Sequence, residues 1–173
     1  MISLGEITPF WALSLAYWLH MLATVVWIGG LVSLVILVLP AAKRVLEPDV
    51  FAQFLEALQR RLDPLGWLSL SVLLATGLIQ MSANPNYDGF LTFSNRWATS
   101  ILIKHVLFIG MIAVSAYMTW GLFPALRRNA LLKAKGGDTL DGGKLERRES
   151  FLLRLNLILS ILILGLTALA RAS

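Results

Sequence analysis

The sequence predicts an all-α integral membrane protein, a four-transmembrane-helix bundle, and two observations lead to this fold class. Hydrophobic residues make up 57% of the 173-residue chain, charged residues make up only 14%, and the mean hydropathy is +0.74. A soluble domain carries about 25% charged residues. Four apolar segments also reach the roughly 20 residues that a helix needs to cross a bilayer. We therefore predict one membrane domain, residues 1–173, with spans at about 10–39, 64–83, 97–123 and 151–170.

Each span and connection has its own signature. The first apolar run is about 30 residues long and follows no basic stretch, so we interpret it as a retained span rather than a signal peptide. Apolar residues at helical spacing over about 49–61 predict an amphipathic interfacial helix before span two. The turn-rich connection 82–96 offers Phe90 and Phe93 as interfacial anchors. Two Gly-Gly pairs in the polar stretch 127–150 predict a mobile loop.

The basic residues predict how the chain lies in the membrane. Twelve of the 15 lysines and arginines fall in or beside the first and third connections, and basic loops stay in the cytoplasm. We therefore expect both termini on the outer side of a bacterial inner membrane. The net charge of +5 reflects this orientation in the lipid bilayer and does not indicate nucleic-acid binding. The absence of cysteine excludes disulfides, thiolate-held iron–sulfur clusters and covalently attached c-type haem.

The two halves of the chain resemble each other. His20 precedes Pro40 by 20 residues and His105 precedes Pro124 by 19, and a basic pair follows three residues after each proline. Apolar segments with basic flanks align easily, but the shared order of histidine, proline and basic pair is harder to obtain by chance. The pattern predicts two parallel helical-hairpin repeats related by an axis along the membrane normal.

Only two histidines occur, and both lie inside predicted spans. An ionisable side chain at membrane depth marks a functional site by default. If Trp11 and Trp97 mark the outer interface, His20 and His105 both lie about 12–14 Å below it, at 1.5 Å per residue. Under the repeat the two imidazoles would face each other across the bundle.

Two facing imidazoles predict a metal centre, and b-type haem with His20 and His105 as axial ligands is the first hypothesis. Lys104, Arg96 and Arg171 could pair with its propionates. The residues expected to line the haem slot are Ala16, Ala23, Trp27, Phe108 and Ile112. Copper is the alternative metal, because Met21, Met111 and Met118 lie near or below the histidines and thioethers suit Cu(I). In a third interpretation each histidine only hydrogen-bonds between helices.

Known families share these motifs. The pattern H-x6-W-x-G-G at His20, with its proline-basic exit, and the lysine-bearing third span resemble the copper-resistance D (CopD) family over about residues 12–128. The chain is also similar to HemJ-type protoporphyrinogen oxidases, four-span haem b proteins, at His20, Arg61-Leu62, Thr76–Leu78 and Lys104. It departs from both families in carrying His105 directly after the lysine, and it lacks the Tyr-His that ends span three in the HemJ type.

The sequence therefore favours a bis-His haem b protein that acts in electron transfer, alone or as a small subunit of a larger redox complex. Its partners would be a quinone or a periplasmic electron carrier, and a homo-oligomer is open. The alternatives are a CopD-type copper-handling protein, a HemJ-type oxidase and a cofactor-free accessory subunit. No span carries paired carboxylates, so an electron carrier is favoured over a stand-alone enzyme.

Overall fold

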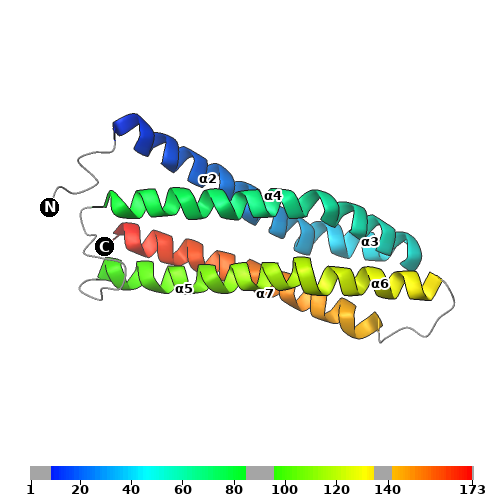
Figure 1. Cartoon of the computed structure of the whole chain (residues 1–173). Helices are drawn as coiled ribbons and strands as arrows, with labels where there is room; N and C mark the ends of the chain where they lie inside the picture. Colours follow the sequence, from blue (N-terminus) through cyan, green and yellow to red (C-terminus); the bar gives the residue numbers. More distant parts are fainter. Residues whose placement is uncertain (1–8, 85–95, 135–141, 173) are drawn as a thin grey trace.

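The computed structural model describes residues 9–84, 96–134 and 142–172, and it confirms the predicted all-α four-helix fold (Figure 1). Helical segments in these ranges join end to end into four rods that are long and apolar enough to cross a membrane. In chain order they are α2 (Phe10–Val32), the π-helical η1 (Ser33–Val38), α3 (Leu39–Val45), α4 (Pro48–Ser82), α5 (Arg96–Tyr117), the π-helical η2 (Met118–Leu122), α6 (Phe123–Ala134) and α7 (Gly142–Ala172).

The helices extend further than the sequence predicted. The interfacial helix expected at 49–61 is not separate from span two, because α4 continues through Pro64 to Ser82. A proline inside a helix removes one backbone hydrogen bond, which membrane helices tolerate. The loop expected at 127–150 was wrong over most of its length, since α6 and α7 occupy 127–134 and 142–150. The anchors predicted at Phe90 and Phe93 lie outside the described residues.

The four rods form two hairpins of the same direction. Helix α2 packs most extensively on α4, and α5 packs most extensively on α7, while α2 also contacts α7. Figure 1 shows α2 and α5 both starting at the end of the bundle that holds the two termini, with α4 and α7 running back to it.

Both hairpins carry a π-helical turn at the same place. η1 ends at Val38, two residues before Pro40, and η2 ends at Leu122, two residues before Pro124. A proline has no N–H and its ring crowds the carbonyl of the preceding turn, and a widened turn accommodates both effects. Each π-helix also begins 13 residues after its histidine. This correspondence supports the repeat predicted from the sequence.

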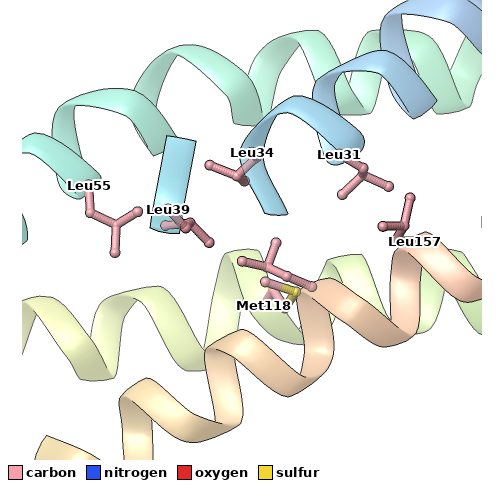
Figure 2. Packing of buried hydrophobic residues seen from close by; sticks show 7 residues of the cluster. Leu31, Leu34, Leu39, Leu55, Met118 and Leu157 are labelled. Carbon is pink, nitrogen blue, oxygen red and sulfur yellow. The ribbon is translucent and has the colours of Figure 1, made fainter. Parts of the chain in front are cut away.

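Two apolar clusters hold the hairpins together. In the half nearer the basic connections, leucines of the first hairpin face Met118 and Leu157 of the second (Figure 2). At the end with the termini, Met81 and Trp97 pack with Ala98 and Ala170. Large apolar side chains elsewhere on the rods, such as Trp18, are exposed on the outside of the bundle. A lipid-facing surface is expected to look like this.

Candidate metal-binding site

His20 is held in one tautomer by a hydroxyl of the neighbouring helix. Its Nδ1 lies 2.8 Å from Oγ1 of Thr76 on α4. The Thr76 hydroxyl donates its only proton to the carbonyl of Val72, 2.6 Å away. It can therefore only accept from His20, so Nδ1 carries the proton and Nε2 keeps its lone pair. Thr76 is only 6% exposed, so water does not compete for this contact.

His105 is fixed in the same tautomer by a different acceptor. Its Nδ1 lies 2.7 Å from the carbonyl oxygen of Ile101, one turn earlier in α5. A carbonyl cannot donate, so Nδ1 again carries the proton and Nε2 again keeps its lone pair. Metal-ligating histidines almost always donate their second ring nitrogen in this way, which orients the ring and raises its basicity. Both imidazoles thus have the same tautomer, with the proton on Nδ1.

Small and polar residues of α2 and α4 surround the His20 ring. A Cβ on Gly77 would lie 3.5 Å from its Cε1, so the glycine leaves room beside the ring. One turn towards the termini, the Gln80 amide donates to the carbonyl of Ala16, 3.2 Å away. The predicted slot residues Ala16 and Ala23 are both buried in this part of the bundle.

A glycine in tight contact with a bulky side chain lies on α4 rather than at the Gly-Gly pair of α2. A Cβ on Gly29 or Gly30 would meet nothing within 4 Å, so no close contact requires a glycine at either position. On α4, a Cβ on Gly66 would lie 3.1 Å from Cζ3 of Trp27. The bulky Trp27 ring on α2 therefore packs against a glycine of α4. The glycines of α2 itself face no such side chain.

The charges that act on His20 are positive. Lys104 on α5 and Arg171 near the end of α7 both lie within electrostatic range of the imidazole. Arg171 also stacks on Tyr17, 5.2 Å from the ring centre. The ion pairs that the structure describes involve Glu56, at the opposite end of the bundle. Arg96 begins α5, but its side chain lies outside the described residues.

The two histidines stand in different surroundings. Lys104 lies seven residues, or two turns, before the buried Met111 and so shares its inward face, whereas His105 lies about 100° further round the helix. His20 is fixed by α4 and His105 by its own helix. The structure thus brings His20 together with Thr76 and within electrostatic range of Lys104.

The aromatic and apolar residues predicted beside the histidines occupy several environments. The Trp27 Nε1 donates to Ser160 Oγ on α7, 3.1 Å away, and so links the two hairpins. Ser160 in turn donates to the carbonyl of Asn156 at 2.8 Å and lies 3.3 Å from the sulfur of Met111. Phe108 and Ile112 are half-buried on α5.

The methionines that motivated copper do not gather at His20. Met21 is 60% exposed on the outside of the bundle, and Met118 is packed into the apolar cluster of Figure 2. Within the ranges 9–84, 96–134 and 142–172, no group of three or more histidine, aspartate or glutamate side chains could hold a metal. A metal at this site would therefore rest on few protein ligands.

A family model connects this bundle to a described group of proteins. Residues 56–170 match the model for copper resistance protein D, which is two thirds of the chain and includes α5 and α7. The chain belongs to the CopD family. The matched region contains Thr76, Lys104 and His105 but not His20, whose similarity rests on its own motif. As a CopD-family protein with four apolar helices, it is a multi-pass membrane protein.

No curated protein and no solved structure matches the chain at a significant level.

Proposed function

We propose that this CopD-family protein handles copper in the membrane and that Nε2 of His20 and Nε2 of His105 are copper ligands. The observation that carries the proposal is the shared tautomer, since each Nδ1–H is donated to a protein oxygen and each Nε2 is the unprotonated ring nitrogen, the atom that can coordinate a metal. Imidazole nitrogen is a good ligand for copper. Thr76 and the Ile101 carbonyl would then serve as the partners that orient the ligands.

A second candidate is a b-type haem protein that transfers electrons, alone or within a larger redox complex. The specific observation in its favour is the positive charge of Lys104 and Arg171 beside His20. A bare metal cation is disfavoured next to two like charges in a low-dielectric site. A haem brings two propionates that would pair with these cations, and axial histidine is a common haem ligand. A quinone or a periplasmic carrier would be the redox partner.

One preparation separates the two candidates. The full chain is purified from cells grown with added copper, and copper is measured by mass spectrometry while the dithionite-reduced absorption spectrum is recorded. Copper bound in the wild type and lost in His20→Ala supports copper handling. Sharp b-type α and Soret bands that disappear in the same variant support haem. A copper stoichiometry that is unchanged in His20→Ala, or haem binding that survives in that variant, would place the centre elsewhere and contradict the corresponding candidate.

We also propose that the basic end of the bundle faces the cytoplasm of a bacterial inner membrane, with both termini outside. The chain contains no cysteine, so single cysteines report topology without background. A membrane-impermeant maleimide should label Ser82→Cys in intact cells but label Lys144→Cys only after lysis. Labelling of Lys144→Cys in intact cells would reverse the orientation.

A further inference from the structure

A cavity of about 130 Å³ lies where the two hairpins meet, in the half of the bundle nearer the basic connections. Helices α2, α4 and α7 and the segment around η2 all line it. A single water needs only about 10–15 Å³ measured in this way, so the cavity has room for an ion with part of its hydration shell. It lies on the side of the Trp27–Ser160 contact that is nearer the basic connections, and His20 does not line it.

A buried acceptor without a partner lines this cavity. Asn156 is only 2% exposed, and its Nδ2 donates to Ser115 Oγ, 2.9 Å away. The Ser115 proton is used by the Met111 carbonyl at 2.8 Å. The other amide atom of Asn156, Oδ1, is buried and has no hydrogen-bond partner among the described residues. Native structures rarely leave such an atom unsatisfied, so we expect a bound hydrogen-bond donor or a cation at this oxygen.

The cavity also contains a carboxylate without a lining cation. Asp63 on α4 lines the cavity and accepts a hydrogen bond from Thr119, another lining residue. No lysine, arginine or histidine is among the side chains that the structure places on the cavity wall. Asp63 is partly buried, and a carboxylate withdrawn from water is stabilised by a cation as its partner. The wall therefore bears a single negative charge, in contrast to the surroundings of His20.

The π-helical turn adds further polar and sulfur-containing side chains to the wall of the same cavity. Met118 and Thr119 are the first two residues of η2, and both line the cavity one turn after Ser115. π-helical turns are frequent at functional sites because they displace side chains from the regular helical positions. The lining thus combines a carboxylate, an amide oxygen and a thioether, all of which accept a cation.

We propose that this cavity is a second binding site, for one monovalent cation, with Asp63, Asn156 and Met118 as its ligands. One carboxylate balances one positive charge, and the thioether matches Cu(I) while the two oxygen ligands match a hard ion such as Na⁺. The identification of the ion as Cu(I) rests on the proposed function. The site itself rests only on the cavity, on the carboxylate of Asp63 and on the unpaired Oδ1 of Asn156.

The test uses the full chain in detergent and two ions. Cu(I) is titrated anaerobically against a competing chelator, and the midpoint of thermal unfolding is compared in NaCl and in choline chloride at equal ionic strength. The variants are Asp63→Asn and Asn156→Leu, with Glu56→Gln as the matched control, because Glu56 lies two turns away on the same helix and outside the cavity. Should Asp63→Asn fail to fold, Asn156→Leu and the volume-conserving Met118→Leu replace it.

We expect the wild type to bind a Cu(I) equivalent that persists in His20→Ala and weakens at least about tenfold in Asp63→Asn and Asn156→Leu, but not in Glu56→Gln. A Na⁺-dependent thermal shift with the same variant dependence would also support the site, as one for a hard cation. If neither ion depends on Asp63 or Asn156, the inference is wrong. If Cu(I) then binds to the wild type but not to His20→Ala, the cavity site is wrong and the proposed copper handling at His20 stands. If the wild type binds no Cu(I) at all, the proposed copper handling is wrong as well.

Discussion

The contact between Thr76 and His20 gives the sharpest test of how the site is built. Thr76→Val keeps the shape and branching of the side chain but removes the acceptor that lies 2.8 Å from Nδ1. A buried donor left without a partner costs about 1–3 kcal/mol. His20 is only half-buried, so we expect the lower part of this range, about 1–2 kcal/mol in the free energy of unfolding. Because Thr76 orients the ligand, metal affinity at His20 should also fall by about 10–100-fold.

The chain provides a matched control for this substitution. Thr167 on α7 makes the same local bond, from its Oγ1 to the carbonyl four residues earlier at 2.8 Å. Thr167→Val therefore removes the same group without touching His20, and it should change stability by less than about 0.5 kcal/mol. Both variants are unfolded in mixed micelles and titrated with Cu(I), and Thr76→Ser should restore the wild-type values. If Thr76→Val and Thr167→Val behave alike in both assays, Thr76 does not hold the His20 tautomer.

Three further outcomes follow from the packing. Gly66→Ala should destabilise the protein by about 1–3 kcal/mol in the same unfolding assay, because the new methyl would lie 3.1 Å from Trp27, whereas Gly77→Ala, at 3.5 Å from the His20 ring, should be tolerated in stability. Ser160→Ala should cost about 1–3 kcal/mol by removing the acceptor of the Trp27 indole, with a shift in tryptophan fluorescence. Unchanged stability in Gly66→Ala or Ser160→Ala would contradict the assigned contact. In copper-loaded protein, Gly77→Ala should still weaken Cu(I) binding more than Gly66→Ala does, since only Gly77 borders the His20 ring.

The sequence was sufficient for the fold because the membrane constrains it so strongly. Backbone polar groups in lipid must be satisfied within a helix or a closed barrel, so span number follows from apolar length. The positions of His20, Pro40, His105 and Pro124 also predicted the repeat, and the π-helical turns before both prolines agree with it. Helix ends were harder, since neither Pro64 nor the flanking polar residues terminate a helix here.

The details of the site could not be predicted because they depend on how the helices rotate against each other. Thr76 was visible as a polar residue in span two, but its contact with a histidine 56 positions away is a property of the α2–α4 packing. The same packing decides that Gly66 and Gly77, rather than Gly29 and Gly30, face bulky side chains. The helical position of Lys104, two turns before Met111, is the sequence signal that could have placed it on the inward face.

The buried acceptors were missed for a different reason. Asn156 is a polar residue near the start of span four, and nothing in the sequence shows that one of its two amide atoms is satisfied and the other is not. That asymmetry arises because Ser115 on α5, the other helix of the same hairpin, accepts a hydrogen bond from Nδ2 and offers nothing to Oδ1.

The central claim is that His20 binds a metal centre through Nε2, and its most direct test is the copper content of purified wild-type protein and of His20→Ala. The absorption spectrum of the same samples is recorded alongside. We predict about one copper that is bound at His20 and is absent from the variant, with the variant still helical and monodisperse. A wild-type protein that carries neither copper nor haem after growth in copper and anaerobic Cu(I) loading would contradict the account.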